Sequence, residues 1–198
     1  MTQPKHRAQP SATYFVTTNT WQRRAVFRNN ECASITEETL FLYRERGAYL
    51  IHSYAIMPDH IHTILAPGQS MSLEKSMMLI KGGSSRSIGV RFGGRLPIWQ
   101  PGFTEHQIRN SADFDLHVRY IEGNPVKAKL AYNPRDYPYC SARARFPLDR
   151  WTMASGAKAQ FVASVTAGLR PRPSVSANVT TPFVSISECQ MLGTKGQC

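Results

Sequence analysis

Two histidines, His60 and His62, stand two residues apart in the segment HIHTIL, which is rich in β-branched and apolar residues. Side chains alternate between the two faces of a strand, so both imidazoles would project from one face and Ile61 from the other. Neighbouring imidazoles on a rigid strand suit a divalent metal ion. The same spacing also fits two hydrogen-bonded histidines at a sheet surface, so both interpretations stay open at this point.

A second group of reactive side chains shares one face of a helix predicted near the middle of the chain. At 100° per residue that face carries four polar or aromatic side chains: Asp113, His117, Tyr120 and Asn124. An apolar stripe lies nearly opposite: Phe114, Val118 and Ile121. Tyr120 and Asn124 are one turn apart and would offer a phenol and an amide together. A partly buried tyrosine bonded to a neighbour explains the same pattern.

Local patterns predict the elements that must position these groups. Strands are expected over 11–20, 49–56, 60–65 and about 103–109, and helices over 31–46, 72–92 and 111–124. Ser72 and Ser111 are the expected N-caps, Gly82–Gly83 weaken the second helix, and Pro125 should stop the third before a short helical piece. The order β-α-β-β-α-β-α predicts an α+β, ferredoxin-like (RRM-like) antiparallel sheet with helices packed on one face, plus an added C-terminal helix carrying the tyrosine.

Chain length and composition favour one globular domain with short flanking segments. The chain has 198 residues, of which 41% are hydrophobic and 19% charged. We expect a flexible basic leader over 1–10, a single domain over 11–150, and a mobile or loosely packed C-terminal tail over 151–198, where charges become sparse and no period is visible.

The charge balance points to a polyanionic partner. Lys and Arg number 24 against 13 Asp and Glu, a formal charge of 24 − 13 = +11, and aromatic residues are interleaved with the basic ones. No stretch is apolar enough to span a membrane, and the first ten residues lack the apolar core of a secretory signal. The four cysteines form no CxxC pair, which favours free thiols in a reducing cytoplasm.

Three blocks of sequence resemble the REP-associated tyrosine transposases, a branch of the HUH (Y1-type) single-strand DNA transposases. The string MPDHIHTIL resembles the MPNHxH block, WQPGFTEHQIRN resembles the WQ-x-G-F block, and RYIEGNPVKAKL resembles the block that carries the nucleophile. The resemblance covers roughly residues 11–146, and the three blocks occur in the family's order. It therefore implies that 11–150 is an HUH Y1 transposase-like catalytic domain.

The resemblance also implies residue roles. His60 and His62 would be the metal-binding pair, Tyr120 the catalytic nucleophile, and Asn124 the polar residue that completes the metal site. Four further residues become candidates for positioning DNA or the active site: His106, Arg109, His117 and Lys127. This chain departs from the family at Asp59, where Asn is usual, and a carboxylate there would either strengthen cation binding or cap the turn.

The implied activity is cleavage and strand transfer of single-stranded DNA at palindromic repeat hairpins, through a 5′-phosphotyrosine intermediate and with Mg²⁺ or Mn²⁺. The expected location is the cytoplasm, at the nucleoid when DNA is bound. Two alternatives remain: a non-catalytic single-stranded nucleic-acid-binding protein, and a metal-dependent nuclease that uses water. The sequence leaves undecided the DNA motif, the preferred metal, monomer against homodimer, the role of 151–198, and whether the protein still mobilises DNA.

Overall fold

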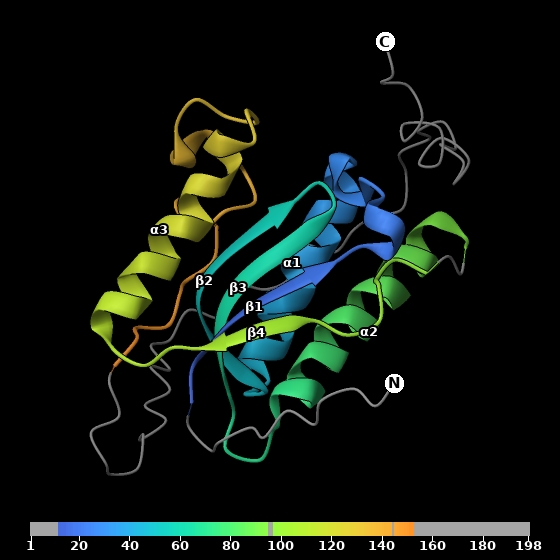
Figure 1. The fold of residues 1–198 in the computed structure, drawn as a ribbon. Helices are drawn as coiled ribbons and strands as arrows, with labels where there is room; N and C mark the ends of the chain where they lie inside the picture. The colour runs from blue at the N-terminus through green and yellow to red at the C-terminus, as the bar shows by residue number, and fades with distance from the viewer. Residues whose placement is uncertain (1–11, 95–96, 144, 153–198) are drawn as a thin grey trace.

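A computed structural model describes residues 12–94, 97–143 and 145–152. Its core is a four-stranded antiparallel sheet (Figure 1) in the order β2-β3-β1-β4. The strands are β1 (Tyr14–Asn19), β2 (Tyr49–Met57), β3 (His60–Pro67) and β4 (Thr104–Gln107). The helices are α1 (Asn30–Glu45), α2 (Leu73–Phe92) and α3 (Ser111–Lys127), with 3-10 turns at Trp21–Arg23, Val26–Arg28 and Pro134–Asp136. The predicted ferredoxin-like α+β fold is confirmed.

The two faces of the sheet are covered by different helices. Tyr54 of β2 packs its ring against Phe41 of α1, with 5.5 Å between ring centroids. On the opposite face Phe15 of β1 contacts His117 and Tyr120 of α3. Because side chains alternate along each strand, β1 and β3 send apolar residues toward α1 and α2. They send Phe15, Thr17, His60 and His62 toward α3, so the candidate catalytic groups meet on that face.

Strand register fixes which residues of that face are neighbours. In the antiparallel pair β1·β3, Thr17 lies opposite His62 and Asn19 opposite His60. In the pair β1·β4, Phe15 lies opposite His106. The tight connection through Pro58 and Asp59 joins β2 to β3, and the Asp59 carbonyl accepts the Thr20 amide at 2.9 Å. The central strand β1 therefore stands between the two histidine groups.

The predicted weakness of the second helix at Gly82–Gly83 does not break it, because α2 is continuous through both glycines. A Cβ on Gly83 would stand 2.6 Å from the Tyr43 ring and 2.9 Å from the Thr39 methyl group. Glycine at 83 therefore lets α2 approach α1 closely, and that packing stabilises the helix against the low helical propensity of glycine. Ser72 caps α2 as expected, since its hydroxyl accepts the Lys75 amide.

The third helix differs from its prediction at both ends. Asn110, and not Ser111, is the N-cap, with its side chain accepting the Asp113 amide at 2.9 Å. Pro125 lies inside α3 and does not stop it. A proline this close to the C-terminus removes only one ladder hydrogen bond, and the Ala128 amide still reaches the Asn124 carbonyl at 2.9 Å. The helix ends where Lys129 adopts a left-handed φ of 56°.

Three other expectations concern the thiols, the flanking segments and membranes. Cys32 and Cys140 are buried free thiols, as expected. The predicted leader over 1–10 and nearly all of the predicted tail over 151–198 lie outside the described residues. Trp151, at the start of that tail, stacks on Phe114 of α3 with 4.5 Å between ring centroids. Across the described ranges, no helix combines the length and apolarity needed to cross a membrane.

Candidate active site

The site lies on the α3 face of the sheet, around the ring of Phe15. Centroid distances from Phe15 are 5.6 Å to His62, 4.7 Å to His117 and 5.8 Å to Tyr120. One apolar ring therefore separates two polar groups, the pair His60–His62 at one side and a cluster that includes His106 at the other. The sequence predicted all of these histidines as candidate site residues. It did not predict how they are grouped, which follows from the register of β1 against β3 and β4.

The imidazoles of His60 and His62 face each other. Their Nε2 atoms are 3.1 Å apart, and the ring planes cross at 78°. Two nitrogens that each bind one ion at about 2.1 Å stand about 3 Å apart when they occupy adjacent coordination positions. The pair therefore has the spacing of two ligands of a single divalent ion.

The other ring nitrogen of each histidine has its own partner. His60 donates its Nδ1–H to the Asp59 carboxylate at 2.6 Å, which leaves a lone pair on Nε2. The Nδ1 of His62 lies 2.7 Å from the Thr17 hydroxyl oxygen. When the single ring proton of His62 is on Nδ1 and Thr17 accepts it, both Nε2 atoms present lone pairs to the same point. Such partners orient metal-binding histidines and fix their tautomers.

Electrostatics keep His62 neutral. Burial, reinforced by repulsion from His60 and Arg23, lowers the pKa of His62 to about 3, although the Asp59 carboxylate opposes this shift. A neutral imidazole is the form that binds a metal ion. At neutral pH the second ligand of the pair is therefore available without deprotonation.

Tyr120 extends from α3 over this pair. Its ring meets that of His62 at 70° with 5.3 Å between centroids, and 41% of the residue is exposed. Lys127 places its ammonium 5.3 Å from the centre of the Tyr120 ring. Asn124, one turn beyond Tyr120, donates its Nδ2–H to the Tyr120 carbonyl at 2.8 Å, so its amide oxygen stays available as an acceptor. His62, Tyr120 and Lys127 therefore lie together, and Asn124 lies one helical turn beyond Tyr120.

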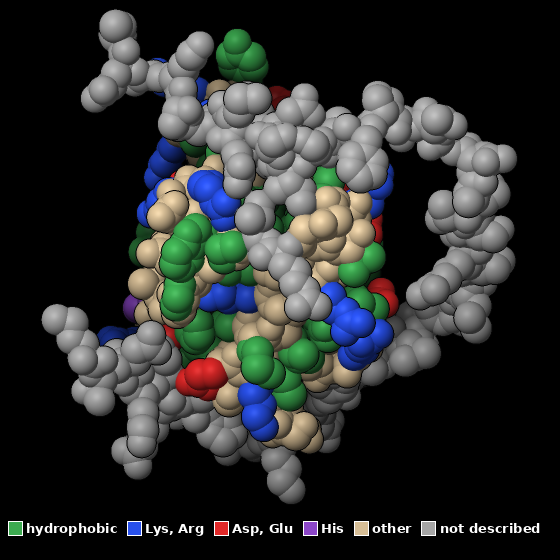
Figure 2. All heavy atoms as spheres, turned by 90° about the vertical axis from the view of Figure 1, so that its right-hand side faces the viewer, with side chains coloured by type: hydrophobic (Ala, Val, Ile, Leu, Met, Phe, Trp, Pro, Cys, Tyr) green, Lys and Arg blue, Asp and Glu red, His purple; other side chains and the backbone are tan. Residues whose placement is uncertain are grey.

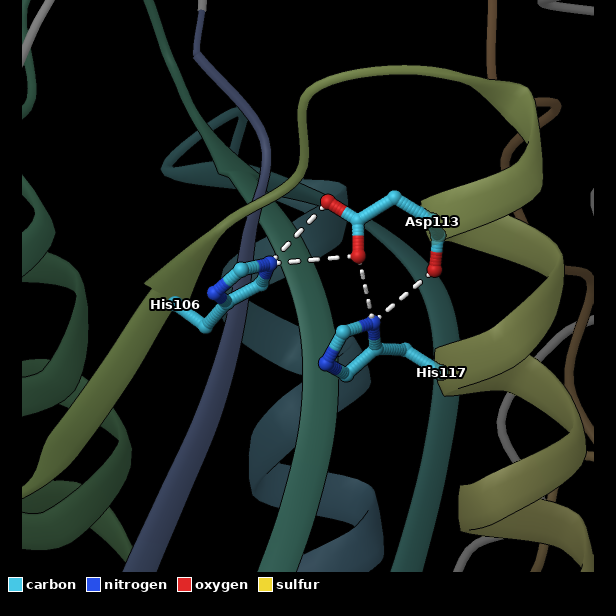
Figure 3. A group of neighbouring side chains, drawn as sticks. All are labelled: His106, Asp113 and His117. Carbon is cyan, nitrogen blue, oxygen red and sulfur yellow. Dashed lines mark hydrogen bonds and ion pairs between the residues drawn. The ribbon is translucent and has the colours of Figure 1, made fainter.

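A second cluster joins β4 to the start of α3 (Figure 3). His106 donates its Nε2–H to both Asp113 carboxylate oxygens at 3.1 and 3.0 Å, and His117 Nδ1 lies 3.0 Å from the same carboxylate. The His117 Nδ1–H also donates to the Asp113 carbonyl at 2.8 Å. The ligand atoms of the three residues lie within 4.8 Å of one another, so the His-Asp-His cluster can hold a metal ion.

Two groups thus compete for the predicted cation. In the His-Asp-His cluster the nitrogens that face Asp113 act as donors, and the carboxylate also accepts the Arg109 amide at 3.0 Å. Its hydrogen bonds are therefore satisfied without an ion. In the pair His60–His62 the two Nε2 atoms are 3.1 Å apart: one donates to the other in one tautomer, and both present lone pairs when His62 carries its proton on Nδ1. The pair and the His-Asp-His cluster are therefore two candidate cation sites, and the cluster also joins β4 to the start of α3.

Burial by itself raises the pKa of Asp113. Hydrogen bonds from His106 and from the Arg109 amide lower it, as do the charges of His106 and His117. Together these interactions outweigh burial, so the pKa lies below its ordinary value of 3.8. Asp113 is therefore ionised at neutral pH and anchors both imidazoles. The Arg109 amide joins this cluster, while its side chain is exposed on the surface.

Strained backbone brings one further cation to the metal-binding pair. Gln22 and Arg23 both adopt left-handed φ values, 53° and 55°, which disfavour residues other than glycine. Arg23 Nη1 lies 3.3 Å from the Asp59 carboxylate, whose other oxygen accepts the His60 proton. The carboxylate of Asp59, the residue that departs from the family pattern, therefore contacts both His60 and Arg23.

Sequence reasoning missed Thr17, Arg23 and the role of Asp113. Asp113 lies one helical turn before His117, so the shared helix face carried a usable signal. Thr17 and Arg23 carried none, because their neighbours, His62 of β3 and Asp59 of the turn before it, are 45 and 36 residues away in the sequence. The face shown in Figure 2, on the α2 side, has its Lys and Arg side chains spread among apolar ones, and no single basic patch stands out there.

Comparisons with known proteins agree with this geometry. Residues 8–124 match the family model described as "Transposase IS200 like". A REP-associated tyrosine transposase of Escherichia coli K12 is 29% identical over 143 residues, which span 69% of this chain and 83% of that protein. A solved structure of a REP-associated tyrosine transposase bound to a REP hairpin aligns with a TM-score of 0.61 at 26% identity, over 77% of this chain and 92% of that one.

Proposed function

Because the chain belongs to the IS200-like transposase family, we propose that it nicks and rejoins single-stranded DNA at palindromic repeat hairpins, with Tyr120 as the nucleophile. The observation that carries this proposal is the approach of Tyr120 to His62, with 5.3 Å between ring centroids. A nucleophile and a metal-binding pair meet within one chain, which supports an active site formed in cis. The similarity to a hairpin-bound relative supports the substrate class.

The proposed step is a transesterification. The Tyr120 oxygen attacks the scissile phosphorus, a P–O bond to tyrosine forms, and the P–O3′ bond breaks. The leaving oxygen takes a proton and departs as a 3′-hydroxyl, while the 5′-phosphate stays on Tyr120. Attack by a 3′-hydroxyl on this phosphotyrosine reverses the step and rejoins the strand. Because one phosphodiester bond replaces another, rejoining needs no ATP.

The residues present fit a divalent cation. His60, His62 and the Asn124 amide oxygen would hold it, and imidazole with amide oxygen suits Mn²⁺ and accepts Mg²⁺. When bound, such an ion polarises a phosphoryl oxygen and offsets its developing negative charge. The chain's own contribution is the orientation of the ligands: Asp59 fixes His60, and Thr17 contacts His62.

Positive side chains around the pair would bind the DNA backbone. Two cations lie beside the proposed catalytic groups: Arg23 on the Asp59 carboxylate and Lys127 over the Tyr120 ring. His117 directs its Nδ1–H to Asp113, so its Nε2 is the nitrogen that can take up a proton in the site. We assign His117 to proton transfer and His106 to positioning it through Asp113.

The test is covalent capture on a denaturing gel. Labelled single-stranded DNA with a repeat hairpin is incubated with the full chain in Mn²⁺, in Mg²⁺ and in EDTA. We expect a metal-dependent protein–DNA adduct that Tyr120→Phe abolishes. Tyr132→Phe is the matched control, because Tyr132 is fully exposed and should form the adduct as the unaltered chain does.

Two outcomes would overturn the proposal. Metal-dependent cleavage without an adduct, retained in Tyr120→Phe, would identify a nuclease that uses water. Hairpin binding with no cleavage of any repeat and no adduct would identify a nucleic-acid-binding protein. In either case Tyr120 would have no role as a nucleophile.

A further inference from the structure

A buried oxygen beside the metal-binding pair has no hydrogen-bond donor. The side-chain oxygen Oδ1 of Asn19 is buried and accepts no hydrogen bond from any part of the chain that the structure describes. A buried acceptor without a donor destabilises the folded state, so buried polar groups are rarely left without a partner. The backbone of Asn19 is satisfied, since its carbonyl accepts the Gln100 amide at 2.9 Å. The side-chain oxygen, by contrast, lacks a donor within the described residues.

Strand register places this side chain at the candidate cation site. Asn19 lies directly opposite His60 in the antiparallel pair β1·β3. It also shares a sheet face with Thr17, two residues earlier, which contacts His62. Opposite residues of such a pair have Cβ atoms about 4.5–5.5 Å apart. The Asn19 amide therefore belongs to the same surface as the two converging Nε2 atoms.

The neighbouring polar groups on this surface are already engaged with each other. His60 donates to Asp59, and His62 contacts Thr17. The Nε2 atoms of His60 and His62 face each other at 3.1 Å. When His62 carries its proton on Nδ1, both of them and the Asn19 amide oxygen can offer lone pairs to one cation. Amide oxygen is a hard ligand suited to Mg²⁺ and Mn²⁺, and it balances the softer imidazoles.

We propose that Asn19 is a further oxygen ligand of the cation held by His60 and His62, an inference that rests on the proposed function. All three groups belong to the sheet, on the central strands β1 and β3. Asn124, by contrast, comes from α3. The sheet alone would therefore supply three ligands, without a contribution from α3.

Mn²⁺ binding to the full chain, without DNA, tests this assignment. Free Mn²⁺ is measured by its paramagnetic resonance signal during a titration of the unaltered chain, Asn19→Ala, Asn19→Asp and His60→Ala. We expect Asn19→Ala to weaken Mn²⁺ binding by about tenfold or more, and Asn19→Asp to strengthen it by adding a negative charge. Asn30→Ala, which removes an exposed asparagine of α1, is the control and should bind as the unaltered chain does.

Thermal unfolding in EDTA separates a ligand from a structural asparagine. Removal of an acceptor without a donor should leave the Tm of Asn19→Ala unchanged or higher, whereas loss of a structural amide would lower it. Mn²⁺ affinity equal to that of the unaltered chain would overturn the inference and leave the proposed function intact. Absence of any Mn²⁺ binding that depends on His60 would instead overturn the cation site itself.

Discussion

Asp59 and His60 are adjacent in the chain and bonded through their side chains, with 2.6 Å between the carboxylate oxygen and Nδ1. This contact turns Nε2 of His60 toward Nε2 of His62, 3.1 Å away. The other oxygen of Asp59 binds Arg23. One carboxylate therefore orients the imidazole of His60 and holds the guanidinium of Arg23 beside it.

Removal of this carboxylate should loosen the cation site. We expect Asp59→Ala to weaken Mn²⁺ binding by about 10- to 100-fold, as loss of a group that orients a metal-binding histidine does. Asp59→Asn should weaken binding less, because the amide oxygen still accepts from Nδ1. Isothermal titration with Mn²⁺ measures the effect, and Asp115→Ala, an exposed position on α3, serves as control. Equal affinities in Asp59→Ala and the unaltered chain would contradict the orienting role.

Arg23 should act on the scissile phosphate as well as on general DNA affinity. A plot of the logarithm of DNA affinity against the logarithm of salt concentration has a slope set by the number of phosphate contacts. Loss of any one phosphate-binding cation makes that slope shallower by about 1. We expect Arg23→Ala also to lower the cleavage rate at saturating DNA by about tenfold or more, because its guanidinium lies at the catalytic pair. Arg86→Ala, an exposed arginine of α2, provides the comparison and should leave the saturated rate unchanged.

Asp113 should make stability depend on acid. Its pKa in the folded protein lies below 3.8, with burial opposed by His106, the Arg109 amide and His117. A carboxyl whose pKa is depressed by folding stabilises above its unfolded pKa, and this contribution is lost as pH falls through the folded pKa. In EDTA, we expect Asp113→Asn to be less stable than the unaltered chain at pH 7, with the difference shrinking below about pH 4. Urea unfolding at several pH values measures it, and a difference that does not vary with pH would exclude this linkage.

The two glycines of α2 should respond in opposite directions to a methyl group. At Gly83 a Cβ would meet the Tyr43 ring at 2.6 Å, whereas at Gly82 it would meet nothing within 4 Å. Gly82→Ala should stabilise the protein by about 0.5–1 kcal/mol through helix propensity. Gly83→Ala should destabilise it by about 1–3 kcal/mol through overpacking against α1. Urea denaturation of both variants measures the contrast, and equal effects would show that α1 and α2 do not pack this closely.

Local sequence patterns predicted most of the fold and the types of residue in the site. Alternation along HIHTIL correctly placed His60 and His62 on one face of β3, and helical periodicity put Tyr120 and Asn124 one turn apart. These patterns are local, because the side-chain periods of a strand and a helix depend only on the backbone of that element. The expected breaks at Gly82–Gly83 and Pro125 were wrong, since packing and chain position outweighed propensity there.

Only the tertiary structure decided which of these residues meet. The register of β1 against β3 brings Thr17 to His62 and Asn19 to His60, and shifting it by one residue would turn these side chains to the other face. Docking of α3 on the face opposite α1 brings Tyr120 to His62 and joins Asp113 to His106. Such pairings join segments that are distant in the sequence and are selected by the packing of the whole sheet. The sequence by itself therefore determined the chemistry available, and the tertiary structure decided its geometry.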